Sequence, residues 1–275
     1  MELKILEEKD NVLRFLLKGV NHAYANSLRR AMLAEVPVMA IEDVIVVENT
    51  SVLYDEIIGH RLGLIPLKTD LDAYVLPEEC DCKSELGCSR CRASFTVEVE
   101  AVDEPVIVYS SDLKPETNVT PVSSNIPIVK LGPSQRLRLE LYARLGRGIE
   151  HAKWQAVCAS AYKYLPKVNV NPDNLANPEE VITICPTDVY ANDPESKIVV
   201  RDETACTLCM NCVSKAVPVD PKKTFPIKIE GDESAFVFYV ESTGALPPRR
   251  VVAEASKILE KKASSLNELL RKGLD

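Results

Sequence analysis

The sequence contains little glycine, only 10 residues in 275, and no long run of apolar residues. The lack of such a run excludes a membrane-spanning helix, and the opening residues MELKILEEKD do not have the pattern of a signal peptide. An excess of basic residues is also lacking: the net charge is −8, whereas binding a nucleic-acid backbone requires clustered Lys and Arg. We therefore expect a cytoplasmic protein that contacts no membrane and does not bind nucleic acid by itself.

Catalytic motifs are missing as well. His22, His60 and His151 are the only histidines, and none stands beside a nucleophilic Ser or Cys or in a metal-binding HExxH pattern. The sequence also has no glycine-rich loop of the kind that binds phosphate groups. These absences predict a scaffold protein without catalytic residues of its own.

An amphipathic helix is predicted between Asn21 and Pro37. Residues at helical spacing form its apolar stripe: Tyr24, Leu28, Ala31 and Met32. Asn21 suits the N-cap position, and Pro37 disfavours helical conformation in the residue before it. An arginine pair, Arg29 and Arg30, stands among residues that are otherwise mostly small or apolar.

A second amphipathic helix is predicted at the C-terminus, beginning at Pro247 and Pro248. Its apolar residues keep close to a heptad spacing: Val252, Ala255, Leu259, Leu266 and Leu270. We expect the two helices to form one packing unit, although most of the chain lies between them. Part of their apolar surface would remain uncovered, which indicates a protein partner.

The segment between the helices alternates apolar and polar residues in several stretches, which predicts strands and the α+β fold class. Residues 2–8 and 12–18 are typical of a hairpin. The stretch from Gly59 to Leu67 is rich in glycine and proline and predicts a sharply shaped loop. Residues 230–233 are predicted to form a turn between two strand pairs. The expected domains are 1–40 with 223–275, then 41–168, and 169–222.

One cysteine group indicates an iron–sulfur cluster. Cys206, Cys209 and Cys212 have the spacing C-x2-C-x2-C, and a Cys-Pro pair stands earlier at Cys185. In two-cluster ferredoxins the Cys before Pro in one half ligates the cluster of the other half. The remaining ligand positions of this repeat carry residues that cannot ligate iron: Leu175, Pro178, Val181 and Ala216.

We therefore predict one cluster in a small ferredoxin-like domain, held by Cys185, Cys206, Cys209 and Cys212. A set of thiolate ligands of this size indicates [4Fe–4S], which becomes [3Fe–4S] when one iron is lost. A zinc site or two disulfides are the alternatives for the same cysteines.

The other cysteine group lies within the predicted β-rich domain. Cys80, Cys82, Cys88 and Cys91 follow the spacing C-x-C-x5-C-x2-C in an acidic loop. Four thiolates this close in sequence can close on one Zn²⁺ ion, and closed four-thiolate sites are structural. Two local disulfides are the alternative. The remaining cysteine, Cys158, is expected to be a small buried hydrophobic residue.

Several sequence blocks resemble one known family. They are Leu28-Arg29-Arg30 with Val36-Pro37, then His60 to Leu67, then Gly148 with His151-Ala152-Lys153-Trp154, and finally Phe236 to Gly244. The blocks cover nearly the whole chain. Together with the cysteine insert, they are similar to the family that contains the bacterial RNA polymerase α subunit, its archaeal counterpart and the third-largest subunit of the eukaryotic enzymes.

The resemblance implies a non-catalytic assembly subunit of a nucleotidyltransferase complex, DNA-directed RNA polymerase. In this family the terminal segments form a discontinuous dimerisation domain, and the β-rich domain is inserted into it. The implied partners are a smaller α-like subunit L in a heterodimer, subunits N and P, and the second-largest catalytic subunit. DNA would be contacted only indirectly.

The residues expected at the subunit interface are Tyr24, Leu28, Arg29, Arg30, Met32, Val252, Leu259 and Leu266. The cysteines leave a different hypothesis open. In that hypothesis the chain is an iron–sulfur protein for electron transfer or redox sensing.

Overall fold

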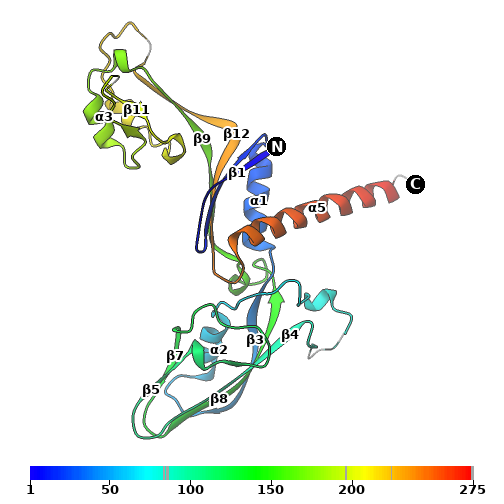
Figure 1. The fold of residues 1–275 in the computed structure, drawn as a ribbon. Coiled ribbons are helices and arrows are strands. Elements are labelled where there is room, and N and C mark those ends of the chain that lie inside the picture. Colours follow the sequence, from blue (N-terminus) through cyan, green and yellow to red (C-terminus); the bar gives the residue numbers. More distant parts are fainter. Residues whose placement is uncertain (83, 85–86, 196, 224, 274–275) are drawn as a thin grey trace. The chain divides into compact units, whose positions relative to one another are not determined.

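The computed structural model of the chain is a mixed α+β structure, which confirms the predicted class (Figure 1). It describes residues 1–82, 84, 87–195, 197–223 and 225–273. Positions 83, 85 and 86 of the predicted cysteine loop, and positions 224, 274 and 275 of the predicted terminal domain, lie outside these ranges. Two compact units are formed: Met1–Glu8, Leu13–Asn26 and Ala161–Tyr239 in the first, and Lys9–Val12, Ser27–Ser160 and Val240–Asp275 in the second.

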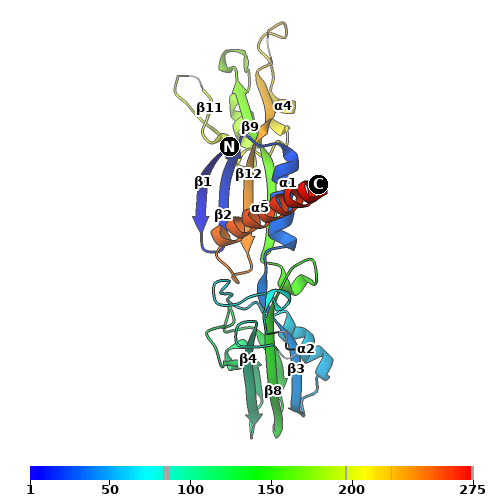
Figure 2. The same cartoon turned by 90° about the vertical axis from the view of Figure 1, so that its right-hand side faces the viewer.

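The first unit is built on a four-stranded sheet in the order β1-β2-β12-β9, whose strands lie side by side in Figure 2. The strands are β1 (Glu2–Lys9), β2 (Val12–Lys18), β12 (Ile227–Ser242) and β9 (Val157–Val170). Aromatic rings pack on this sheet: Phe15 stacks on Phe238 with ring centroids 4.8 Å apart, and Tyr162 meets Phe236 edge-on. The predicted hairpin at 2–8 and 12–18 is therefore confirmed as β1 and β2.

Beyond this sheet the first unit contains short elements that carry cysteines. They are the helices α3 (Pro178–Ile184) and α4 (Asn211–Lys215), the strand pair β10 (Tyr190–Ala191) and β11 (Val199–Val200), and the 3-10 helices η4 (Pro172–Asn174) and η5 (Glu203–Ala205). Helices α3 and α4 pack against each other. The elements share an apolar core that includes Val181, Val189 and Ile198.

The second unit contains the sheet β3-β8-β4-β6 and the strand pair β5-β7. Their bounds are β3 (Val38–Asn49), β8 (Gln135–Gly146), β4 (Arg92–Ala101), β6 (Lys114–Pro115), β5 (Val106–Tyr109) and β7 (Pro127–Leu131). Helix α2 (Asp55–Gly63) packs on β3, and the 3-10 helices are η1 (Pro77–Glu79), η2 (Ser110–Asp112) and η3 (Ala152–Trp154). The core holds Phe95, Ile41 and Leu139 between these elements.

Helix α1 (His22–Ala34) begins as the sequence predicts, because the Asn21 side chain accepts a hydrogen bond of 2.9 Å from the backbone N–H of Tyr24. Helix α5 (Pro248–Lys272) begins directly after Pro247. Lys262 of α5 forms an ion pair with Glu35, which immediately follows α1, and Figure 2 shows α5 crossing α1. The end of α1 and the middle of α5 are therefore neighbours in the second unit. None of the described helices has the length and apolar character that a membrane crossing requires.

The packing around Trp154 explains why glycine occurs in the sequence block that contains Gly148 and Trp154. Trp154 is buried, and a Cβ atom on Gly146 would overlap its ring. A Cβ atom on Gly148 would overlap the carbonyl oxygen of Leu33 at the end of α1, and Ile149 donates its backbone N–H to another α1 carbonyl. Glycine is thus required at position 146 because the Trp154 ring fills the space there, and at position 148 because the loop passes directly over the C-terminus of α1.

Two local predictions are wrong. Most of the expected loop from Gly59 is helix α2, because Ile58 and Leu62 are both buried at helical spacing and their packing outweighs the low helix propensity of glycine. The expected turn at 230–233 is absent, since β12 runs continuously through it. Gly231 lies against Tyr164 of β9, where an added Cβ would come within 2.9 Å of the tyrosine Cβ.

Candidate functional site

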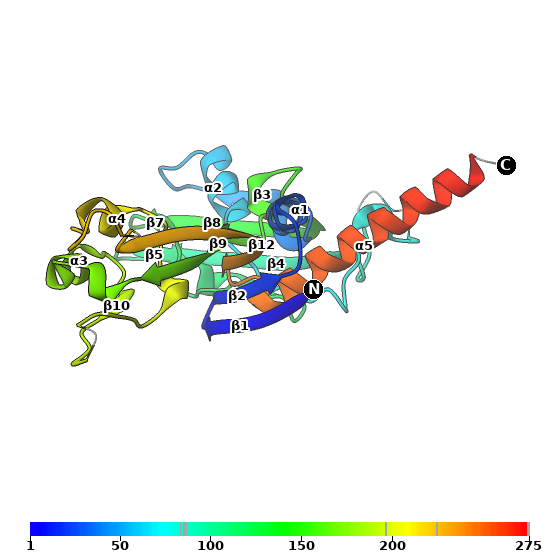
Figure 3. The same ribbon diagram turned by 90° about the horizontal axis from the view of Figure 1, so that it is seen from above.

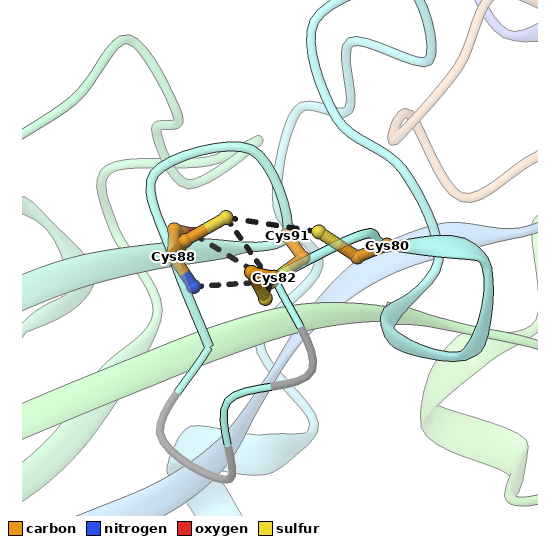
Figure 4. Close-up of side chains that lie close together, drawn as sticks. All are labelled: Cys80, Cys82, Cys88 and Cys91. Atoms are coloured by element: carbon orange, nitrogen blue, oxygen red, sulfur yellow. Dashed lines mark hydrogen bonds between the residues drawn. The ribbon is translucent and has the colours of Figure 1, made fainter.

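The cysteines at 80–91 converge at the start of β4 (Figure 4). Cys80 follows η1 and Cys91 immediately precedes β4, so two ordered elements bring the ends of the loop together. All four Sγ atoms lie within 4.8 Å of one another. The Sγ–Sγ distances are 3.7 Å for Cys80–Cys88, 3.8 Å for Cys82–Cys91 and 3.8 Å for Cys88–Cys91.

These distances fit a single tetrahedral metal ion. Four sulfur atoms placed about 2.3 Å from a central Zn²⁺ form a tetrahedron with edges of about 3.8 Å. The backbone N–H of Cys88 also donates a hydrogen bond of 3.1 Å to the Cys91 sulfur, an interaction that suits a thiolate ligand. All nine cysteines of the chain are thiols without a disulfide. The residues present therefore fit a metal ion held by four thiolates.

The thiols at this site differ in acidity. The backbone N–H of Arg90, together with neighbouring thiols, lowers the pKa of Cys88 to about 7. Burial raises the pKa of the Cys91 thiol to about 12. The backbone N–H of Cys82 opposes an increase at Cys80, but hydrogen bonding to the Cys82 thiol and burial outweigh it and raise the Cys80 pKa. In the metal-free protein, Cys80 and Cys91 are therefore neutral at pH 7, and metal binding must displace their protons.

The cysteines predicted to hold a cluster lie in the first unit. Cys206 and Cys212 are buried in the apolar core there, Cys185 packs against that core, and Cys209 is exposed. In the part of the chain that the structure describes, no three of these thiols lie close enough together to hold a single metal ion. An iron–sulfur cluster is larger than one ion and holds its ligands farther apart, so this spacing disfavours a zinc site more than a cluster.

The two predicted half-motifs end at corresponding places in the structure. Helix α3 ends at Ile184, directly before Cys185, and helix α4 ends at Lys215, directly before Ala216. Leu175 and Pro218, which flank the two half-motifs, form an antiparallel bridge. The Tyr190 hydroxyl donates a hydrogen bond of 3.2 Å to the Cys212 sulfur. Sequence reasoning missed Tyr190, although it stands only a few residues beyond the Cys-Pro pair.

Cys158 was expected to be buried, and this prediction is wrong. The side chain is exposed, and its thiol contacts the carbonyl oxygen of Glu241 at 3.4 Å. The reason is the alternation of β9, which turns Val157 into the core and Cys158 to the opposite face.

The predicted interface residues on the two terminal helices differ in exposure. Leu28 and Met32 are buried, Tyr24, Arg29, Val252 and Leu259 are half-buried, and Arg30 and Leu266 are exposed. Burial on α5 therefore falls along its length. Val251 and Ala255 near its start are fully buried, whereas Leu266, Leu269 and Leu270 near its end are 58%, 67% and 56% exposed.

Two of the exposed leucines of α5, Leu266 and Leu269, line a groove in the second unit. The groove has a volume of about 790 Å³, and Leu266, Leu269 and Ile149 contribute apolar side chains to it. Lysines and acidic residues stand among them, including the Lys262–Glu35 ion pair. Figure 3 shows the last turns of α5, in red, projecting past the rest of this unit. An apolar helix surface of this kind indicates a protein partner.

Comparison with known proteins assigns this chain to a family. Residues 14–263 match the RNA polymerase Rpb3/Rpb11 dimerisation domain. The chain belongs to the Rpb3/Rpb11 dimerisation family. It is 41% identical over 274 residues to the DNA-directed RNA polymerase subunit Rpo3 of Archaeoglobus fulgidus, covering 98% of this chain and 97% of that protein. The Rpo3 of Methanosphaera stadtmanae is 39% identical over 269 residues, covering 97% of each chain.

Eukaryotic members of the Rpb3/Rpb11 family are also similar. The DNA-directed RNA polymerase II subunit rpb3 of Dictyostelium discoideum is 36% identical over 293 aligned positions, which cover 99% of this chain and 96% of that protein. The family match includes all of α1, most of α5 and both cysteine groups. The exposed leucines at the end of α5 begin only a few positions beyond it.

Proposed function

We propose that this chain is a non-catalytic platform subunit of DNA-directed RNA polymerase. Its relatives carry that polymerase in their names and align over nearly their whole length. The main structural support for the proposal is the exposed apolar surface at the end of α5. Burying a fully exposed leucine side chain contributes roughly 1.5–3 kcal/mol. The three leucines at the end of α5 are 56–67% exposed, so burying them would favour association by several kcal/mol before entropic costs.

The partner that we propose for this surface is a smaller α-like chain, subunit L. A second amphipathic helix pair with the same pattern would place its own apolar stripe against α1 and α5. In this arrangement residues 1–40 and 223–275 are a discontinuous dimerisation domain, 41–168 an inserted domain, and 169–222 a ferredoxin-like domain. Subunits N and P and the second-largest catalytic subunit would then assemble on the heterodimer.

We further propose zinc at the 80–91 group and an iron–sulfur cluster at Cys185, Cys206, Cys209 and Cys212. The zinc proposal is supported by Sγ–Sγ distances of 3.7–3.8 Å, which match a tetrahedral four-thiolate site. The cluster proposal is supported by the ferredoxin spacing and by the helix ends before Cys185 and Ala216. When bound, each group would cross-link the short segments of chain that carry its ligands.

Co-expression tests the platform proposal. The chain alone should self-associate, and co-expression with subunit L should give a soluble complex with one copy of each chain. Leu266→Glu places a charge in the groove and should abolish the complex. Val52→Glu is the matched control, because Val52 is an exposed apolar residue of the second unit outside the groove. A stable monomer that does not bind subunit L would contradict the proposal.

A further inference from the structure

Two residues of β9 bind the segment Glu203–Cys206, which leads into the C-x2-C-x2-C motif. The Lys163 ammonium group donates hydrogen bonds to the carbonyl oxygens of Thr204, at 2.7 Å, and of Cys206, at 2.6 Å. Farther along the strand, the backbone N–H of Val168 donates to the Glu203 carboxylate at 2.6 Å. Helix η5 and the first cysteine are thereby fixed to the sheet of the first unit.

The loop that follows has an unusual backbone conformation. Leu208 and Met210 adopt positive φ values of 59° and 63°, which residues with side chains rarely do. The Leu208 backbone N–H points to the Cys206 sulfur at 3.4 Å. Concave runs of backbone N–H groups with such conformations are typical of anion and iron–sulfur sites. The donor set and the loop geometry therefore fit a cluster ligated by Cys206 and its partners.

The Lys163 side chain binds the backbone of this loop directly. Its ammonium group holds the Cys206 carbonyl oxygen. The same contact places a positive charge beside the cysteines that are proposed to ligate the cluster. Lys167 stands on the same strand but forms an exposed ion pair with Asp232 at 2.9 Å. The two lysines share strand and charge, and they differ in whether they touch the cysteine loop.

We propose that Lys163 is a positioning residue for the iron–sulfur cluster, which it retains through the Cys206 loop and whose reduced form it stabilises by charge. This inference rests on the cluster ligation proposed above. Hydrogen bonds and nearby charge are among the protein's means of setting the reduction potential of a cluster. A positive charge favours the reduced cluster, which carries one more electron, and so raises its potential.

The test compares variants of the full chain, purified anaerobically together with subunit L. Lys163→Met removes both the charge and the hydrogen bonds, Lys163→Gln retains a donor without the charge, and Lys163→Arg retains the charge. Lys167→Met is the matched control. Iron and sulfide are counted per chain, cluster loss to an iron chelator is followed by visible absorbance, and the midpoint potential is measured by dye-mediated titration.

Lys163→Met should lose its cluster roughly tenfold faster than the unmodified protein, because two charge-assisted hydrogen bonds to the loop are gone. The midpoint potential should shift to more negative values in Lys163→Met and in Lys163→Gln. Lys163→Arg should keep the original potential, and Lys167→Met should match the unmodified protein in both measurements. If Lys163→Met does not fold, the potential of Lys163→Gln alone decides the charge effect.

The outcomes separate the two proposals. Unmodified protein that binds no iron overturns the cluster ligation and the role of Lys163 with it. Unmodified protein that binds iron, with unchanged potential in Lys163→Gln, overturns the role of Lys163 alone. Equal losses in Lys163→Met and Lys167→Met would also overturn it, because they would reflect general damage to β9.

Discussion

Replacing Cys91 with serine tests the proposed zinc site. Cys91 is buried at the start of β4, and its sulfur lies 3.8 Å from the sulfurs of Cys82 and Cys88. The serine oxygen is a poorer zinc ligand than a thiolate and sits on a shorter side chain, so the site would retain three good ligands. Cys158→Ser is the control, since Cys158 is an exposed thiol in none of the cysteine groups.

The expected loss of affinity follows from the closed geometry. A structural zinc site contributes roughly 10–16 kcal/mol of apparent binding free energy, or about 3 kcal/mol for each of four thiolates. Removing one thiolate should therefore weaken zinc binding roughly 100-fold. The apolar core around Phe95 lies in the sheet and includes neither Cys91 nor the other cysteines of the 80–91 group. The variant should therefore loosen the loop and leave the global unfolding transition nearly unchanged.

Four measurements check this prediction. Zinc per chain is counted after gel filtration, zinc transfer to a chromogenic chelator gives the relative affinity, and limited proteolysis reports on the loop at 80–91. Calorimetry in buffers of different ionisation enthalpy gives the protons released on binding. Because the pKa values of Cys80 and Cys91 are raised, binding should release protons at pH 7 and weaken as the pH falls.

A native protein in which these four thiols are already oxidised, when it is purified without reductant, would contradict the proposed zinc site. Normal zinc content and affinity in Cys91→Ser would contradict it as well. Either result would mean that the observed Sγ–Sγ distances do not reflect metal ligation.

Further predictions concern the fold. Gly148→Ala should lower the free energy of unfolding by about 2 kcal/mol in urea titration, because its Cβ would overlap a carbonyl oxygen of α1. Gly59→Ala, at a helical position with open space around it, should instead raise it by about 0.8 kcal/mol. Lys167 and the Ser234 hydrogen bonds lower the pKa of Asp232 to about 2. Asp232→Asn should therefore cost about 1 kcal/mol at pH 7, a difference that disappears as the pH falls from about 4 to 2.

Local signals in the sequence predicted the parts of the structure that depend on local interactions. The N-cap of α1 needs only the Asn21 side chain and a backbone N–H three residues later. The convergence of Cys80 and Cys91 likewise follows from short spacing in a loop with little core of its own. In both cases the residues that interact are close in sequence, so the pattern itself carries the information.

The wrong predictions depend on contacts between distant segments. The glycines near Gly59 indicated a loop, but burial of Ile58 and Leu62 against the sheet made the segment helical. The polar residues at 230–233 indicated a turn, yet Gly231 packs under Tyr164 and the strand continues. The Lys163 contact joins residues 41 and 43 positions apart, and no sequence pattern marks it.

An α-like partner that covers the end of α5 is central to the proposed role of this chain. Hydrogen exchange of the chain alone and in complex with subunit L measures this directly. We predict strong protection of amides around Leu266 and Leu269 in the complex, with little change in β3 and β8 of the inserted sheet. Equal exchange of these α5 amides in the two samples would contradict this role, because the exposed leucines would then not be part of the interface with subunit L.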